Sequence, residues 1–415
     1  MHSFFKLPFH PLPPDDPNLS LQRGRIHEFF KYTKPHRKLL EQIELVIIDE
    51  ISMVRADIID AIDRILRVYS HNLREPFGGK QLLLVGDVFQ LEPVVKNDER
   101  DILNRFYPTP YFFSARVFGQ IDLVSIELQK VYRQTDPVFV SVLDHIRTNT
   151  AGAADLQLLN TRYGSQIEES EADMYITLAT RRDTVDSINE KKLAELPGDP
   201  ITFEGVIEGD FPESSLPTSQ ELVLKPGAQI IFIKNNFDRR WVNGTIGVIS
   251  GIDEEEETIY VITDDGKECD VKRESWRNIR YRYNEKTKEI EEEVLGSFTQ
   301  YPIRLAWAIT VHKSQGLTFS RVVIDFTGGV FAGGQAYVAL SRCTSLEGIQ
   351  LKKPISRADV FVRPEIVNFA GRFNNRQAID KALKQAQADV QYVAAARAFD
   401  KGDMEECLEQ FFRAI

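Results

Sequence analysis

The chain has 415 residues, of which 42% are hydrophobic and 27% are charged. This balance is typical of folded globular proteins and excludes a disordered chain, and the length predicts two or three domains at about 100–200 residues each. The net charge of −11 excludes a protein that coats nucleic acid through its overall charge, although a local basic groove is compatible with it.

Cysteine content and hydropathy indicate the compartment. The chain has three widely separated cysteines (Cys269, Cys343 and Cys407), which offer neither a disulfide framework nor a paired metal motif. It has no run of about 18 apolar residues that would span a membrane, and its first residues lack the apolar run of a secretory signal. We therefore expect a cytoplasmic protein with no membrane contact.

The first part of the chain reads as an α/β domain. A region rich in proline and aromatic residues predicts a loop with one short helix near residues 21–32. The apolar run 44–50 ends in two acids, the pattern of a buried parallel strand, and 81–87 repeats it after a helical spacing over 53–69. Strands alternating with amphipathic helices predict a doubly wound sheet with its ligands at the carboxyl ends of the strands.

A second α/β block begins near residue 125. Residues 125–134 lead into a predicted helix over 137–147, and 174–182 form a predicted strand. Residues 225–299 differ, because their short strands are separated by Asn-Gly and Asp-Gly turns. They predict a small antiparallel insertion of the size of an SH3 barrel. The α/β pattern then returns at 300–370.

The fold class is therefore α/β, and the last residues form a helical extension. The chain from 371 to 415 predicts two helices hinged at Gly402-Asp403, which we interpret as a cap or as a docking segment for a protein partner. The expected boundaries are 1–124 for the first α/β domain, 125–224 with 300–370 for the second, 225–299 for the β insertion and 371–415 for the extension.

Asp49 and Glu50 end the first apolar strand. Two carboxylates at a dry strand end are costly unless a cation compensates them. As in nucleotide hydrolases, they predict a site in which Asp49 holds Mg²⁺ through water and Glu50 orients the attacking water. The alternative interpretation is that they cap the following helix.

The string Gly86-Asp87-x-x-Gln90 stands at the end of the next strand, so we expect its side chains to converge on the same crevice. Gly86 permits a tight turn there. The amide of Gln90 can hydrogen-bond a γ-phosphate oxygen or the attacking water, which would make it a sensor of the phosphate.

Two arginines supply the next prediction. Arg133 is expected at the start of a helix and Arg342 on a late helix. Isolated arginines are ordinarily surface residues. In a second α/β block that faces the first, they would instead act as arginine fingers on the γ-phosphate.

A loop expected between a strand and a helix combines small donors with one cation. That chemistry suits the phosphate oxygens of a nucleic-acid strand, with the amides of the helix start as further donors. His312 on its own would more often be a structural hydrogen-bonding residue. The loop residues are Thr310, His312, Lys313, Ser314, Gln315 and Gly316.

These motifs, in this order, resemble the superfamily 1 DNA helicases of the Pif type (petite integration frequency), which are related to RecD. The resemblance rests on segments 49–53, 86–94, 128–147, 243–248, 306–318 and 335–348 and covers about residues 1–350. It implies two RecA-like motor domains, the first incomplete here, and an SH3-like insertion in the second. It also implies ATP-driven movement from 5′ to 3′ on single-stranded DNA.

The resemblance assigns roles residue by residue. Glu50, Gln90, Arg133 and Arg342 would be catalytic, and Asp49 would bind the metal. The implied nucleotide contacts are Asp49, Gln90, Arg133, Gly316 and Arg342, and the implied DNA contacts are His2, Ser3, Thr310, His312, Lys313, Ser314 and Gln315. The implied cofactors are ATP and Mg²⁺. The implied partners are single-stranded and forked duplex DNA, met by a monomer near the nucleoid during repair, recombination or replication.

One family motif does not occur in this sequence. Helicases of this type carry the phosphate-binding loop G-x-x-x-x-G-K-[ST] before the segment that corresponds to residues 2–5. Here Gly79-Lys80 precedes Gln81 and Gly266-Lys267 precedes Glu268, so neither pair completes the motif.

The missing motif has structural and functional consequences. We expect a sequence that begins part-way through a helicase, with unpaired strand edges and bare apolar faces in its first sheet, and no ATP turnover by these residues alone. The alternative is a non-hydrolysing nucleic-acid-binding or scaffolding remnant.

Overall fold

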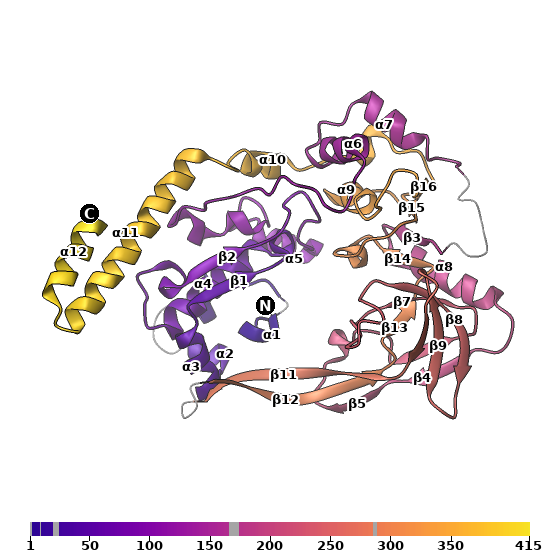
Figure 1. Ribbon diagram of the computed structural model, residues 1–415, viewed down its shortest axis with the longest axis horizontal. Helices are drawn as coiled ribbons and strands as arrows, with labels where there is room; N and C mark the ends of the chain where they lie inside the picture. The colour runs from indigo at the N-terminus through magenta and orange to yellow at the C-terminus, as the bar shows by residue number, and fades with distance from the viewer. Residues whose placement is uncertain (1, 9, 20–24, 166–173, 285–288) are drawn as a thin grey trace. The chain divides into compact units, whose positions relative to one another are not determined.

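The computed structural model describes residues 2–8, 10–19, 25–165, 174–284 and 289–415 (Figure 1). The chain divides into two compact units. The larger unit comprises residues 1–117 and 131–363, and the smaller unit comprises 118–130 and 364–415. Among the described helices, none has both the length and the apolar character that a membrane crossing requires.

The described residues of the N-terminal part of the larger unit form two short parallel strands and five α-helices. Its strands pair in register, with Leu45 opposite Gln81 and Ile48 opposite Leu84. The elements are α1 (His2–Phe5), α2 (Arg25–Phe30), α3 (Lys34–Gln42), β1 (Leu45–Ile48), α4 (Ala56–Tyr69), β2 (Gln81–Leu84) and α5 (Asn97–Leu103). The two strands and α4 confirm the predicted alternation.

Helix α4 forms the core of this part. Its apolar side chains recur at helical spacing and are buried, from Ile58 to Tyr69. Three aspartates at three-residue intervals on α4 are also buried: Asp57, Asp60 and Asp63. Asp60 accepts hydrogen bonds from the Tyr107 hydroxyl at 2.8 Å and from the backbone N–H groups of Arg116 and Val117, both at 3.0 Å. Buried carboxylates on α4 thus hold surrounding loops.

The expected burial of the first two strands was wrong. Leu45, Ile47, Leu83 and Val85 are 44–59% exposed, because β1 and β2 form a two-stranded sheet with no further strand beside them among the described residues. The expectation of bare apolar faces on this sheet is confirmed.

The second α/β part of the larger unit has a four-stranded parallel sheet in the order β14-β3-β15-β16. Its elements are α6 (Pro137–Arg147), α7 (Ala153–Asn160), β3 (Ile176–Ala179), α8 (Arg182–Glu195), β14 (Ala308–Thr310), β15 (Val322–Asp325), α9 (Gln335–Leu340) and β16 (Ile349–Leu351). All four residues of β3 and of β15 are buried, as expected for central parallel strands.

Two local predictions about this part were wrong. Arg133 does not lie in a helix, because α6 begins only at Pro137, where the Asp136 side chain accepts from the N–H groups of Val138 and Phe139. The segment after β14 contains a single 3₁₀ turn over His312–Ser314 and then runs on to β15 without an α-helix.

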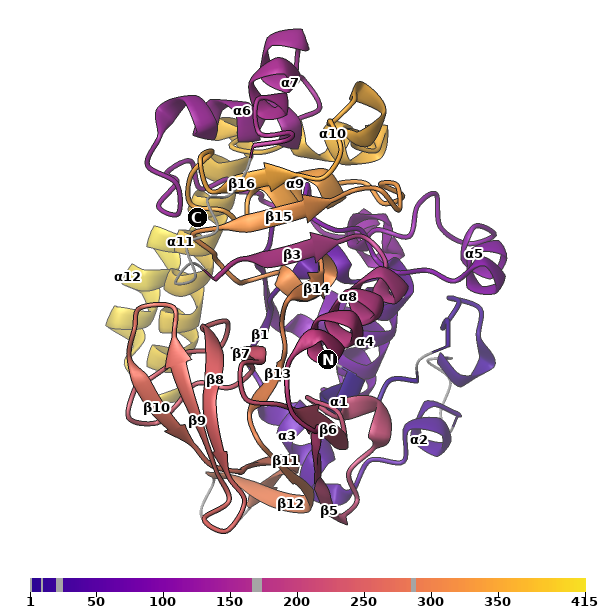
Figure 2. The same cartoon turned by 90° about the vertical axis from the view of Figure 1, so that its right-hand side faces the viewer.

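The β region is antiparallel throughout and forms sheets of five, three and two strands (Figure 2). Its strands are β4 (Ile201–Glu204), β5 (Val206–Gly209), β6 (Glu221–Leu224), β7 (Gln229–Phe232), β8 (Ile246–Asp253), β9 (Thr258–Thr263), β10 (Glu268–Val271), β11 (Glu274–Asn284), β12 (Glu289–Gln300) and β13 (Ile303–Leu305). β5 pairs with β12 and β13 pairs with β7, so the pairing extends beyond the predicted range 225–299 on both sides.

The smaller unit is helical, with α10 (Pro364–Ala370), α11 (Arg376–Asp400) and α12 (Met404–Ala414). The predicted hinge is confirmed, because Gly402 has a φ of 79° and the Asp403 side chain caps α12 through the N–H of Glu406. Ser125 and Glu127 hydrogen-bond with Asn374, so this stretch of chain belongs to the helical unit.

Candidate nucleotide and nucleic-acid site

The two acids at the end of β1 are held by an unusual backbone turn. Asp49 accepts the N–H of Glu50 on its carboxylate at 2.8 Å. Glu50 adopts a left-handed conformation with a φ of 51°, which is uncommon for a residue other than glycine. Glu50 makes no side-chain capping bond to the 3₁₀ turn that follows. The helix-capping interpretation is therefore not supported for Glu50.

The pKa of the Glu50 carboxyl depends on charged residues from distant parts of the sequence. Burial raises its pKa, the negative charges of Asp49 and Asp87 raise it further, and the positive charge of Arg342 opposes them. A carboxyl in this setting holds a proton more readily than usual, as a general base that accepts a proton from water must.

Gly86 allows the end of β2 to approach the Glu50 turn. Its φ is 153°, and a Cβ on Gly86 would lie 2.9 Å from the backbone nitrogen of Ile51. That nitrogen donates to the carbonyl of Val85 at 3.0 Å. Any side chain at Gly86 would force the two predicted motifs apart.

The loop that carries Gln90 touches the start of α9. Gly334 precedes this helix with a φ of 76°, and a Cβ there would lie 2.3 Å from the carbonyl oxygen of Phe89 and 2.4 Å from that of Gln90. A glycine is therefore required for α9 to pack on the Gln90 loop. The Gln90 loop therefore contacts the second α/β part through its backbone, and the expected convergence of the Gln90 side chain with Asp49 and Glu50 stays a prediction.

Two residues that sequence reasoning missed contact the same loop through Asp87. Arg147, at the end of α6, places its Nε 3.5 Å from the Asp87 carboxylate, and its guanidinium lies over the Phe89 ring at 4.5 Å. Burial raises the pKa of the Tyr337 hydroxyl, and its hydrogen bond to the negative Asp87 adds to the shift. The sequence holds no local signal for these long-range pairs.

Arg133 lies in extended chain before α6. Its Nε donates to the Thr318 hydroxyl at 2.9 Å and its Nη1 to the carbonyl of Ser341 at 3.3 Å. The neighbouring Gln134 is buried and donates to the carbonyls of Ser341 and Cys343. Arg133 is thereby held beside the chain that leads to Arg342.

Arg342 differs from the prediction in two respects. It follows the last residue of α9 by two positions, and it is only 1% exposed. Its guanidinium donates to the Val338 carbonyl and the Ser341 hydroxyl at 3.0 Å, and to the carbonyls of Ser314 and Leu317 at 3.5 Å. Burial, together with the positive charge of Arg133, lowers its pKa to about 10, against the attraction of Glu50. Several of its donors are thus already engaged by protein oxygens.

Asp49, Glu50 and Asp87 have the carboxylate chemistry that Mg²⁺ prefers, and Arg133 has a guanidinium suited to phosphate. The described residues contain no group of three or more His, Cys, Asp and Glu side chains arranged to hold a metal ion. The glycine-rich cradle and its lysine are also missing from the 415 residues. The residues present therefore fit the hydrolytic side of an ATP site and not its phosphate cradle.

The turn after β14 is tightly organised. The Thr310 hydroxyl accepts the N–H of Lys313 at 3.2 Å. Ser314 is fully buried, and its hydroxyl donates to the Val311 carbonyl at 2.8 Å. Its side chain therefore stabilises the turn and is not available to a DNA strand. This corrects the expectation that Ser314 contacts DNA directly. Burial lowers the pKa of His312 and favours the neutral ring.

Lys313 remains exposed and has positive neighbours. Partial burial lowers its pKa, and the charges of Arg304 and Arg182 lower it further, against the opposing effect of Asp186. Cations that repel one another are relieved by an anion bound among them. Arg182 was missed because α8 lies far from this turn in sequence, and Arg304 was missed because nothing local to β13, which directly precedes β14, shows that its side chain lies near Lys313.

Four further predicted residues have limited descriptions. Gln315 is half-buried, and its Nε2 has no hydrogen-bond partner among the described residues, whereas Gly316 is exposed with a φ of 76°. His2 and Ser3 begin α1, and their side chains lie outside what the structure describes.

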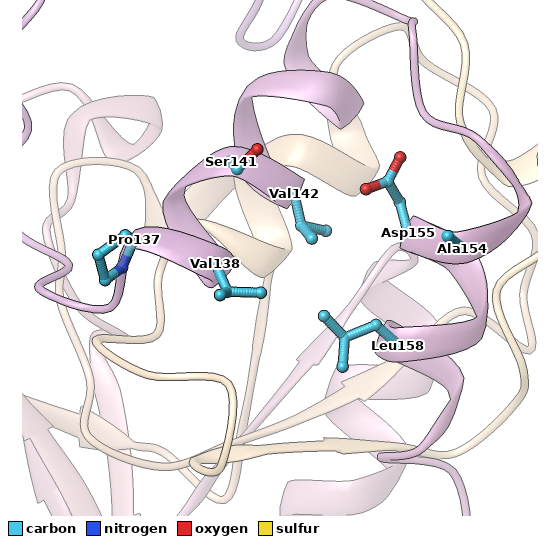
Figure 3. A pocket seen from close by; sticks show the side chains of 7 residues that line it. All are labelled: Pro137, Val138, Ser141, Val142, Ala154, Asp155 and Leu158. Carbon is cyan, nitrogen blue, oxygen red and sulfur yellow. The ribbon is translucent and has the colours of Figure 1, made fainter.

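A shallow apolar pocket between α6 and α7 is separate from these residues (Figure 3). Val138 and Val142 of α6 lie across from Leu158 of α7. The Asp155 carboxylate accepts from His145 at 3.0 Å, and this hydrogen bond is the largest cause that lowers the pKa of Asp155. None of the predicted nucleotide or DNA residues lines the pocket.

Acids at one sheet edge, the Gln90 loop packed on a second α/β part and a cationic turn define a RecA-like nucleic-acid motor as the class of protein. A model of the PIF1-like helicase family matches residues 1–149. The ATP-dependent DNA helicase Pif1 of Campylobacter jejuni is 34% identical over 359 residues, which cover 83% of this chain and 76% of that protein. The chain belongs to the Pif1 helicase family.

The human ATP-dependent DNA helicase PIF1 is 35% identical over 74% of this chain. The match covers 45% of the human protein, so the chain spans less than half the length of that relative.

The structural comparisons agree with this assignment. A crystal structure of Bacteroides sp Pif1 in complex with ADP-AlF4 has a TM-score of 0.78 and 39% identity, and the match covers 89% of this chain and 82% of that one. A Bacteroides Pif1 bound to single-stranded DNA has a TM-score of 0.64 at 38% identity, over 91% of this chain and 84% of that one. Another concerns unwinding at forked duplex DNA by two coordinating Pif1 helicases. The predicted family and the α/β fold class are confirmed.

Proposed function

We propose that this chain is the DNA-tracking part of an ATP-dependent helicase motor, moving 5′ to 3′ on single-stranded DNA. The observation that carries the proposal is the contact between the Gln90 loop and the start of α9, where only a glycine fits. Through this contact, a phosphate-dependent movement of the Gln90 loop would displace the start of α9 in the second α/β part.

The proposed nucleotide chemistry follows from charge. ATP with Mg²⁺ would supply the phosphoryl group and its counter-charge. Asp49 would hold the ion, Glu50 would take the proton of the attacking water, and Gln90 would orient that water. The Arg133 guanidinium retains more free donors, because it makes two hydrogen bonds to protein oxygens whereas that of the buried Arg342 makes four. Arg342 would then act chiefly by holding the turn that ends at Leu317.

The proposed DNA contact is the Lys313 turn with Arg304 and Arg182. Their mutual repulsion favours a bound polyanion. The Bacteroides Pif1 solved with single-stranded DNA and the Pif1 helicases studied at forked duplex DNA support single strands and forked duplexes as ligands. We further propose that the protein acts as a monomer in the cytoplasm, beside the nucleoid, during repair, recombination or replication.

A second candidate function follows from the missing phosphate cradle. Without the lysine and backbone amides that hold the phosphates, the 415 residues would bind DNA and not turn over ATP. In that case the chain serves as a nucleic-acid-binding or scaffolding protein. The bare apolar faces of β1 and β2 favour this candidate.

Titration of a fluorescein-labelled oligothymidylate with the 415-residue chain, followed by anisotropy at several salt concentrations, tests DNA binding. We expect affinity to fall as salt rises, and the Lys313→Ala variant to bind more weakly with a salt slope reduced by about 0.7. Lys401→Ala, a loss of the same charge at the hinge of the helical unit, is the matched control. Salt-independent binding, or equal effects of the two variants, would contradict the proposal.

A further inference from the structure

The connection between β7 and β8 is an ordered loop. Asn236 organises it, since its side-chain oxygen accepts from the N–H groups of Asp238 and Arg240 at 3.0 and 3.3 Å. The N–H of Asn236 donates to the carbonyl of Trp241 at 3.1 Å. Such an Asx turn fixes the backbone without regular secondary structure.

This ordered loop holds an aromatic ring in solvent. Phe237 is 98% exposed, whereas Phe232 and Trp241 at its base are buried and stacked at 4.4 Å. Single exposed apolar residues are ordinary on protein surfaces. A phenylalanine held out by an organised turn, between polar neighbours, is instead suited to stacking on a planar ligand.

The charges around Phe237 favour an anionic ligand. Residues 234–241 carry Lys234, Arg239 and Arg240 against the single acid Asp238. Lys234 forms an ion pair with Glu274 and Arg240 forms one with Asp270, so Arg239 is the cation of this loop that has no ion pair among the described residues. The Arg240 guanidinium lies over the Trp241 ring at 5.1 Å. The acidic run 254–257 follows the opposite end of β8, so the two ends of this strand carry opposite charge.

The loop that carries Phe237 contacts the segment that follows the candidate DNA turn. Gly244 closes the loop with a φ of 99°, and a Cβ there would lie 2.7 Å from Cδ2 of Leu317. Leu317 follows Gln315-Gly316, and its carbonyl accepts from Arg342. The base of the Phe237 loop therefore packs against the turn that presents Lys313.

We propose that Phe237 is a base-stacking site for single-stranded nucleic acid and that Arg239 pairs with an adjoining phosphate. This inference rests on the proposed DNA binding and extends it from phosphate contacts at Lys313 to base contacts on the β region. Aromatic platforms next to cations are a general solution for holding unpaired bases without sequence preference.

The test compares Phe237→Ala with wild type in the anisotropy titration, on oligothymidylate and on an abasic oligonucleotide of equal length. We expect an affinity loss of about five- to tenfold on oligothymidylate, an unchanged salt slope, and no loss on the abasic strand. Phe237→Trp should restore binding. Arg239→Ala should reduce the salt slope on both ligands.

Phe412→Ala, which removes another exposed phenylalanine (72% exposed) from α12, is the matched control and should bind as wild type does. Equal affinity of Phe237→Ala and wild type for oligothymidylate would overturn the inference, as would an equal loss on the abasic strand. A loss of self-association without a change in DNA affinity would identify the loop as a protein contact and also overturn it. If wild type itself fails to bind with a Lys313-dependent salt slope, the proposed function fails first.

Discussion

The contact between Gly334 and the Gln90 loop can be tested by adding one methyl group. In Gly334→Ala the new Cβ would meet the carbonyl oxygens of Phe89 and Gln90 at 2.3 and 2.4 Å, and the residue would keep a φ of 76°. The left-handed conformation costs alanine about 1–2 kcal/mol. Moving the backbone oxygens by about 1 Å adds a packing cost of about 1–3 kcal/mol.

The matched control for this variant is Gly266→Ala. Gly266 has a φ of 79° with nothing within 4 Å of its Cβ position, so the control carries the conformational cost without the clash. We expect urea denaturation to show Gly334→Ala as the more destabilised by about 1–3 kcal/mol. Hydrogen exchange at Phe89 and Gln90 should rise only in that variant. Equal destabilisation of the two variants would refute the packing of α9 on the Gln90 loop.

Two further predictions concern buried and clustered acids. Asp60→Ala removes the acceptor for the Tyr107 hydroxyl and two backbone N–H groups, so urea denaturation should show a loss of about 2–5 kcal/mol; a loss no larger than that of the exposed Asp380→Ala would contradict it. Asp49→Asn removes a negative charge that raises the pKa of Glu50, so carbon-13 titration should show the Glu50 carboxyl ionising at lower pH than in wild type, and an unchanged or higher value would contradict the arrangement. Because the pKa of Glu50 is raised in the folded state, folding stability falls as the pH rises through the Glu50 titration. Asp49→Asn lowers that pKa, so the fall in stability over this pH range should be smaller in the variant than in wild type.

Local patterns predicted the elements that have local causes. The amphipathic spacing of α4 and the Asp136-Pro137 start of α6 each fix a helix within a few residues of sequence. The acids after β1 and the glycine after β2 likewise mark strand ends where the structure has them. Together these residues account for the α/β fold class.

Contacts between distant segments could not be predicted in this way. The pairing of Arg147 with Asp87 depends on how two sheets pack, and a single sequence carries no record of it. The burial of Ser314 and Arg342 has the same origin, because a hydroxyl or guanidinium turned inward looks the same in sequence as one turned outward. The predicted range of the β region, 225–299, was too narrow because β5 and β13, which lie outside it, pair with strands far along the chain.

The central claim is that these 415 residues contain the acid, glutamine and arginine side of a helicase ATP site together with a DNA-binding turn, but not the phosphate cradle. Steady-state ATP hydrolysis with Mg²⁺, with and without single-stranded DNA, tests it most directly. The account predicts no turnover above background in either condition while the DNA remains bound. DNA-stimulated hydrolysis that Glu50→Gln abolishes would contradict it.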